Sequence, residues 1–95
     1  MATGIIPSTH IKYGEFITSL TAGSNRLSDN DGNPTSLVTS GTFPAKPNEC
    51  IYQVVTVGTT NDTNISIHLD GNNRSVLYAK TDVSQTVFFR WYRLV

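Results

Sequence analysis

The carboxyl-terminal run of this chain, residues 86–95 (TVFFRWYRLV), combines aromatic, branched and basic side chains and contains no acid, glycine or proline. Valine and aromatic residues fit the pleated surface of a sheet, so the run predicts a β-strand. Successive side chains of a strand point to opposite faces. Both faces are largely apolar, with Val87, Phe89, Trp91, Arg93 and Val95 on one and Phe88, Arg90, Tyr92 and Leu94 on the other. Such a strand needs cover on both sides.

The rest of the chain also favours strands, because no window shows helical periodicity with capping residues. Residues 64–69 alternate cleanly, which predicts Ile65, Ile67 and Leu69 facing inward and Ser66 and His68 facing outward. An Asp-Gly turn then leads into a further strand, and the two should form a hairpin. The other expected strands are residues 10–20, 36–39, 50–57 and 75–80, separated by turns at 21–25, 58–63 and 81–85 and a proline-containing loop at 41–49.

The predicted fold is therefore all-β, a small antiparallel sandwich or barrel of six or seven strands with jelly-roll-like connections. Ninety-five residues provide one domain, which we expect over residues 10–95 behind an amino-terminal arm of residues 1–9. The segments 20–26 and 69–74 resemble one another. This internal similarity suggests a partial β-trefoil-like repeat as a minor alternative, although a complete trefoil needs three such units.

Charge is sparse and balanced, with seven basic and seven acidic residues and 15% charged residues in all. Ordinary soluble domains have about 25%. The balance argues against nucleic acid or an anionic membrane as partner. Thr, Ser and Asn supply 30 of the 95 positions, which makes a polar surface that is easily desolvated against a partner. The first residues lack the basic region and apolar core of a secretory signal, so we expect a protein made in the cytoplasm and not secreted by a classical route.

No catalytic or metal-binding motif emerges from the sequence. The stretch DNDGN at 29–33 supplies oxygen ligands, but Pro34 and Ser40 stand where an EF-hand calcium loop needs glycine and glutamate, which favours a simple turn. His10 and His68 have no ligand or nucleophile spacing. Cys50 is expected to be a small buried hydrophobe. We therefore predict that the protein is not an enzyme and has no cofactor and no metal.

The basic-aromatic cluster in the last strand is the main candidate site. It suits three roles, namely stacking on single-stranded nucleic acid, a platform for a sugar, or a protein interface rich in aromatic and arginine anchors. Zero net charge and the need for cover on both faces favour the interface. The candidate interface residues are Ile5 and Ile6 in the arm and Phe88, Arg90, Trp91, Tyr92 and Arg93 in the strand.

We accordingly expect a non-enzymatic structural protein that assembles with copies of itself or with a larger structural protein. Its low charge, short length and Thr/Ser/Asn-rich strands resemble those of small virion proteins of bacteriophages, such as capsid decoration or tail components, which would place it in the virion. The alternative is a carbohydrate-binding, lectin-like module. Its sugar would lie on an exposed Trp91 or Tyr92 and bind loop residues Asp29, Asn30, Asp31, Asn72 and Asn73. Exposure of these two aromatics beside the 29–33 loop would separate the two functions.

Overall fold

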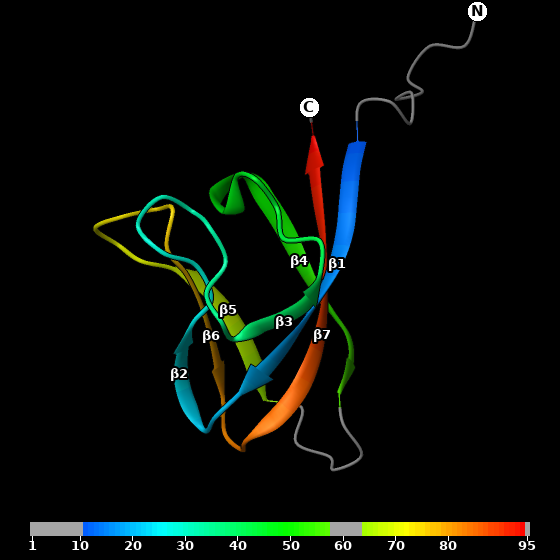
Figure 1. The fold of residues 1–95 in the computed structure, drawn as a ribbon, viewed down its shortest axis with the longest axis vertical. Coiled ribbons are helices and arrows are strands. Elements are labelled where there is room, and N and C mark those ends of the chain that lie inside the picture. The colour runs from blue at the N-terminus through cyan, green and yellow to red at the C-terminus, as the bar shows by residue number, and fades with distance from the viewer. Residues whose placement is uncertain (1–10, 58–63, 95) are drawn as a thin grey trace, which may run out of the picture.

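The structure is a computed structural model that describes residues 11–57 and 64–94, and these residues form seven β-strands and a single turn of 3-10 helix (Figure 1). The helical turn is Pro47–Glu49. The all-β class and the expected number of strands are confirmed. In chain order the strands are β1 (Ile11–Leu20), β2 (Gly23–Arg26), β3 (Val38–Gly41), β4 (Cys50–Val57), β5 (Ile65–Leu69), β6 (Leu77–Thr81) and β7 (Gln85–Leu94).

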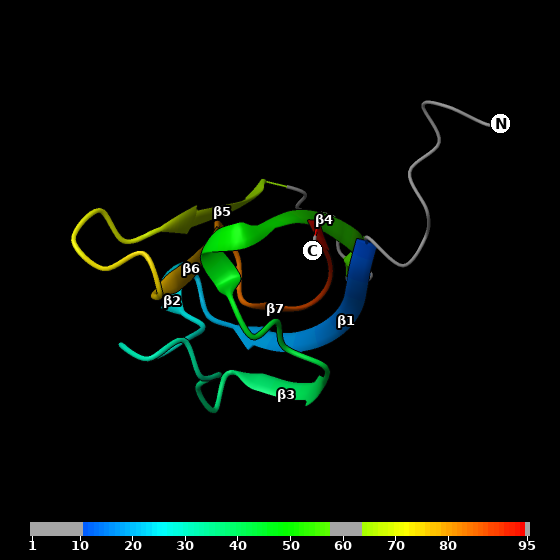
Figure 2. The same cartoon turned by 90° about the horizontal axis from the view of Figure 1, so that it is seen from above.

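The strands pair into two sheets that enclose one core. The four-stranded sheet has the order β3-β1-β7-β4, the three-stranded sheet has the order β2-β6-β5, and every neighbouring pair is antiparallel. Seen along the strands, the two sheets surround a shared interior (Figure 2). This is the sandwich-like arrangement predicted from the sequence, and it contains two sheets where a trefoil would contain three equivalent units.

Two of the places where the chain crosses from one sheet to the other are neighbouring corners. Strand β1 continues into β2 while β6 continues into β7, so the antiparallel ladder that pairs Leu20 with Gln85 resumes with Gly23 opposite Thr81. The buried amide of Asn25 holds the first corner: its Nδ2 donates to the carbonyl of Thr21 at 2.9 Å, and its Oδ1 accepts from the Thr21 amide at 3.0 Å. The same Nδ2 reaches the carbonyl of Ala79 in β6 at 3.2 Å.

These contacts explain one difference from the sequence prediction. Residues 21–25 have turn chemistry and were expected to form a turn only, but the side chain of Asn25 supplies the local hydrogen bonds and lets β2 begin at Gly23. Gly23 has a φ of +107°, a backbone conformation that favours glycine. The predicted hairpin is confirmed, since β5 and β6 pair along their whole length from Ile65 opposite Thr81 to Leu69 opposite Leu77.

The core is built by the inward faces of both sheets. In β7 burial alternates, and Val87, Phe89 and Trp91 are buried while Thr86 and Phe88 are exposed. Phe16 of β1 packs against Phe89 with ring centroids 5.5 Å apart. The opposite sheet adds Leu77 and Ala79 of β6, together with the half-buried inward side chains of β5. The apolar periodicity of two in these strands is thus the direct cause of the two-layer packing.

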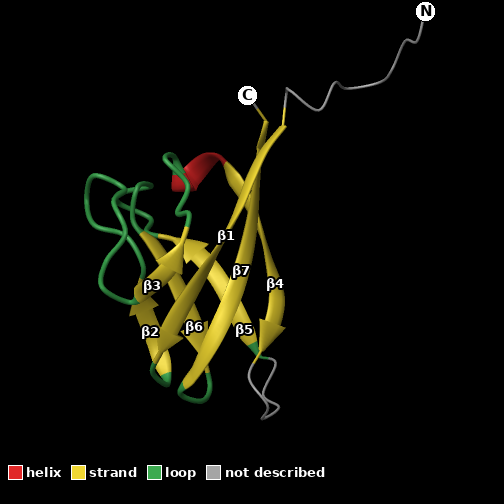
Figure 3. Cartoon of the chain, turned by 45° about the vertical axis from the view of Figure 1, so that its right-hand side comes forward, coloured by secondary structure: helices red, strands yellow, loops and turns green. Residues whose placement is uncertain are grey.

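The connections near residues 27–37 and 70–76 gather at one end of the sandwich, beside the helical turn (Figure 3). The proposed arm, residues 1–9, lies outside the described part of the chain.

Candidate protein interface

The outer face of the four-stranded sheet carries a cluster of exposed apolar side chains. Tyr13 is 70% exposed, Ile51 75% and Leu94 70%, although each belongs to a central or edge strand whose other face is in the core. The register places Tyr13 and Ile51 on either side of Tyr92, and Ile11 opposite Leu94. We call this set the outer patch; it comprises Ile11, Tyr13, Ile17, Ile51, Phe88, Tyr92 and Leu94.

A polar row crosses the outer patch. Glu15 and Arg90 lie opposite each other in the β1–β7 ladder and form an ion pair. Gln53 lies on the other side of Arg90, and its Oε1 accepts a hydrogen bond from the Tyr92 hydroxyl at 3.2 Å. Both side chains of the ion pair are partly exposed, so the pair contributes little to stability but fixes where charge of each sign lies on this face.

Three of the predicted interface residues belong to this face. Phe88 is 38% exposed and Arg90 and Tyr92 are half-buried, all three with side chains on the outer side of β7. Phe88 pairs with Ile17 and lies at the far end of the patch from Leu94. The structure therefore brings Phe88, Arg90 and Tyr92 together with residues of β1 and β4.

Trp91 requires a correction. It was predicted as an interface anchor, but only 6% of it is exposed and it belongs to the core of its own chain. Every second residue of β7 faces inward, and Trp91 lies on the same face as the buried Val87 and Phe89. The indole Nε1 donates to the carbonyl of Thr42 at 2.8 Å, so its polar group is satisfied internally. Trp91 is a packing residue of this fold and offers no ring to a partner.

Arg93 also has a structural partner. It faces the inner side of the strand, where its guanidinium forms an ion pair with Glu49 at 2.9 Å beside the helical turn. Its half-buried side chain thus links the end of β7 to the start of β4. Ile5 and Ile6, the other predicted interface residues, lie outside the described residues.

Sequence reasoning missed the most exposed members of the outer patch. Tyr13 and Ile51 were assigned to strands but not to the interface, and the strand period of two could have identified them. Phe16 and Leu20 mark the core face of β1, which leaves Tyr13 on the other face. What the sequence lacked was the pairing order, because only the ladder shows that Tyr13, Tyr92 and Ile51 form one row.

The residues of the alternative sugar site are brought close together by the fold. Asn73 Nδ2 donates to the carbonyl of Asn30 at 3.2 Å, which joins the 28–34 and 70–76 loops. Their polar groups are largely engaged within these loops: Asp29 Oδ1 accepts from the amides of Asp31 and Asn33, and Asn73 Oδ1 accepts from the Ser75 amide. The Asn33 amide holds the pKa of the Asp29 carboxyl below its usual value.

The sugar-binding alternative also required Trp91 or Tyr92 to lie exposed beside these loops, and neither ring does. Trp91 is enclosed by the core, and Tyr92 lies half-buried on the outer face of the four-stranded sheet with its hydroxyl bound to Gln53. Asn72 and Asp31 remain exposed at the loop surface. The arrangement accordingly gives hydrogen-bonding groups without the stacking ring that was expected to accompany them.

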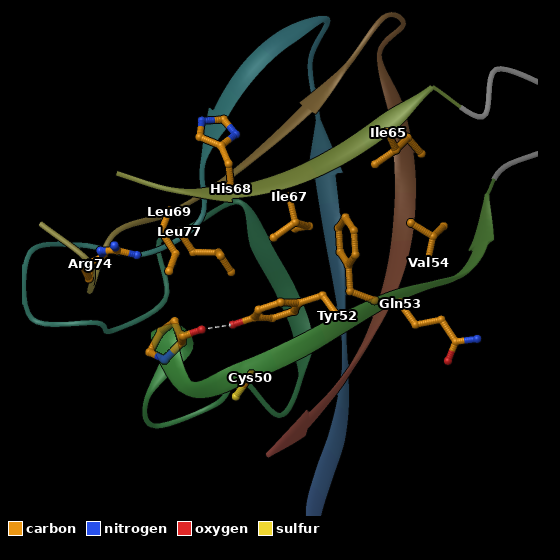
Figure 4. Close-up of a pocket in the computed structure, with 12 residues that line it drawn as sticks. Cys50, Tyr52, Gln53, Val54, Ile65, Ile67, His68, Leu69, Arg74 and Leu77 are labelled. Atoms are coloured by element: carbon orange, nitrogen blue, oxygen red, sulfur yellow. Dashed lines mark hydrogen bonds between the residues drawn. The ribbon is translucent and has the colours of Figure 1, made fainter. Parts of the chain in front are cut away.

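The structure also shows a groove on the opposite side of β4 from the outer patch (Figure 4). It has a volume of about 510 Å³ and lies between β4 and β5. Tyr52 lies in it and donates its hydroxyl hydrogen to the carbonyl of Pro47, in the helical turn before β4, at 2.8 Å. Cys50 lines this groove and is half-buried, so the prediction of a buried small residue holds only in part; burial raises the pKa of its thiol, which favours the neutral form.

Over residues 11–57 and 64–94, no group of three histidine, cysteine or acidic side chains is placed to hold a metal ion. His68 faces outward as predicted and stacks on Tyr78 with ring centroids 5.3 Å apart, while His10 lies outside the described residues. In the same described part of the chain, no helix is long and apolar enough to cross a membrane. The sequence matches no protein-family model, no curated protein and no solved structure.

Proposed function

We propose that this chain is a non-enzymatic assembly protein that binds a second copy of itself through the outer patch. The observation that carries the proposal is the two-sided character of the four-stranded sheet: one face builds the core, and the other presents large apolar side chains to solvent. Large apolar side chains that gather on the exposed face of a sheet are typical of interaction sites. Tyrosine is also among the residues that most often anchor protein interfaces.

The charge pattern supports a second copy as the partner. In a dimer with a two-fold axis parallel to the strands and between β1 and β7, each β1 faces the β7 of the other copy. Glu15 then faces the second copy's Arg90, and Arg90 faces the second copy's Glu15. The same operation sets Tyr13 against the second copy's Tyr92 and Ile17 against its Phe88. The outer patch is thus complementary to itself in both charge and apolar content.

The biological setting that we propose is a bacteriophage virion, in which such a subunit would serve as a capsid decoration or tail component. The support is compositional: few charged residues and strands rich in Thr, Ser and Asn. An adjoining larger structural protein would then meet the surfaces that the dimer leaves free.

Ile51→Lys tests the interface, because Ile51 is the most exposed large apolar side chain of the patch and the substitution leaves the core unchanged. We expect the wild-type protein to sediment as a dimer and Ile51→Lys to raise the dissociation constant roughly thirtyfold or more, equivalent to the about 2 kcal/mol of an anchor residue. Sedimentation equilibrium over a range of concentrations measures both.

Val83→Lys is the matched control, since Val83 is an exposed apolar residue at the β6–β7 corner, beyond the start of β7 and away from the Ile51–Tyr92 end of the patch. It should sediment like the wild type. A wild-type protein that stays monomeric at every concentration, or an Ile51→Lys variant that dimerises normally, would contradict the proposal.

A further inference from the structure

The two sheets share continuous corners on one side, and on the other side their edge strands β4 and β5 are not paired with each other. The corners connect β1 to β2 and β6 to β7, whereas β4 and β5 are the outermost strands of their sheets. Among the described strands no ladder joins β4 to β5. The groove of about 510 Å³ lies along this second side, and its volume falls within the about 300–1,000 Å³ usual for small-molecule sites.

Many of the side chains that line the groove are apolar and only partly covered by the fold, and Gln53, His68 and Arg74 add polar groups to its lining. Figure 4 shows Ile65 and Ile67 of β5 directed toward Tyr52 and Val54 of β4 across the groove, while His68 points to the other side of β5. Ile65, Ile67 and Leu69 are all half-buried although they face inward. Covering the part of these side chains that is still exposed is favourable, because it removes apolar surface from water. The groove is therefore suited to an apolar occupant.

The charge of the groove is confined to one end. Arg74 lies beside Leu69 and Leu77 (Figure 4), and among the described residues it has no hydrogen-bond or ion-pair partner. No carboxylate lines the groove within the described part of the chain. Burial raises the pKa of Tyr52 and of Cys50, so both groups stay neutral at physiological pH. A groove with an apolar floor between β4 and β5 and a guanidinium at one end is complementary to a molecule with an apolar chain and an anionic head.

We propose that this groove binds a single-chain carboxylate amphiphile, with the hydrocarbon chain between β4 and β5 and the carboxylate at Arg74. A planar guanidinium with free N–H groups can hold a carboxylate through two parallel hydrogen bonds. This site does not depend on the proposed dimer, because Cys50, Tyr52 and Val54 face the groove whereas Ile51 lies on the outer patch.

Decanoate is the probe, and 1-decanol is its uncharged counterpart. We expect decanoate to bind one molecule per chain by calorimetry and to shift the methyl resonances of Ile65, Ile67 and Leu69. Arg74→Gln should weaken decanoate binding roughly tenfold or more, the usual effect of losing a hydrogen bond to a charged group, and should leave 1-decanol binding unchanged. Arg74 is an exposed residue, so the variant should fold.

Lys80→Gln removes the same charge from an exposed position of β6 that does not line the groove, and it should bind decanoate like the wild type. Ile51→Lys should also bind normally, which separates this proposal from the dimer. No decanoate binding, or equal affinity in Arg74→Gln and wild type, would overturn it. Concentration-dependent shifts of the groove methyl groups without decanoate would show that a second copy fills the groove, and would overturn it as well.

Discussion

Gly14 and Trp91 face each other in the β1–β7 ladder, and the absence of a side chain at one makes room for the ring of the other. A Cβ added at Gly14 would lie 2.8 Å from Cζ2 of the indole, closer than real Cβ contacts allow. Position 14 therefore requires glycine, because any side chain there would overlap the indole ring of Trp91. The indole cannot move away freely, because its Nε1 is bound to the Thr42 carbonyl.

We predict that Gly14→Ala lowers the free energy of unfolding by about 1–3 kcal/mol, the usual cost of overpacking a filled core. Denaturant unfolding followed by the fluorescence of Trp91 measures the change. Gly71→Ala is the control, since nothing lies within 4 Å of its added Cβ, and it should change stability by less than about 0.5 kcal/mol. Equal stability of the two variants would show that the indole adapts at no cost.

The loop at residues 28–34 is attached to β6 by one buried hydroxyl. Ser28 Oγ donates to the carbonyl of Ser75 at 2.7 Å and accepts from the amide of Leu77 at 2.7 Å. Ser28 is fully buried, so water cannot replace it. A short bridge to Pro34 closes the same loop.

Ser28→Ala should therefore destabilise the protein by about 1–3 kcal/mol, because it leaves two backbone groups of the 75–77 segment without a partner in a dry site. Amide hydrogen exchange should accelerate at Leu77 in particular. Ser36→Ala, at an exposed position, should leave both exchange and stability unchanged. Unaltered protection at Leu77 in Ser28→Ala would argue against this anchoring role.

Strands with strong local signals could be predicted, and those fixed by distant contacts could not. The β5–β6 hairpin follows from the alternation of Ile65, Ile67 and Leu69 and an Asp-Gly turn, all within a few residues. Strand β2, with the sequence GSNR, has no such pattern and exists because Asn25 binds Ala79, 54 residues away. In β7 the sequence gives two apolar faces, but only packing against Phe16 and Leu77 decides that Trp91 faces the core.

The molecule as a whole leaves apolar surface on two sides, the outer patch and the groove, which are separated by the thickness of β4. A single small domain buries a limited share of its surface, and association is one way of covering the remainder. The proposed dimer would cover the patch and leave the groove accessible.

Dimerisation predicts that thermal stability depends on protein concentration. A partner that binds only the folded chain adds about 2.7 kcal/mol when its free concentration is a hundred times the dissociation constant. We expect the wild-type unfolding midpoint to rise with concentration in scanning calorimetry, and the Ile51→Lys midpoint to begin to rise only at concentrations roughly thirtyfold higher. A wild-type midpoint that does not vary over a hundredfold range would contradict self-association.

The corner at Asn25 has one more consequence. Opening the molecule at the β1–β2 bend would break the hydrogen bonds from this amide to Thr21 and Ala79, whereas moving β4 away from β5 would break no ladder hydrogen bond. Thermal opening of the molecule should therefore begin between β4 and β5 and leave the corner at Asn25 closed.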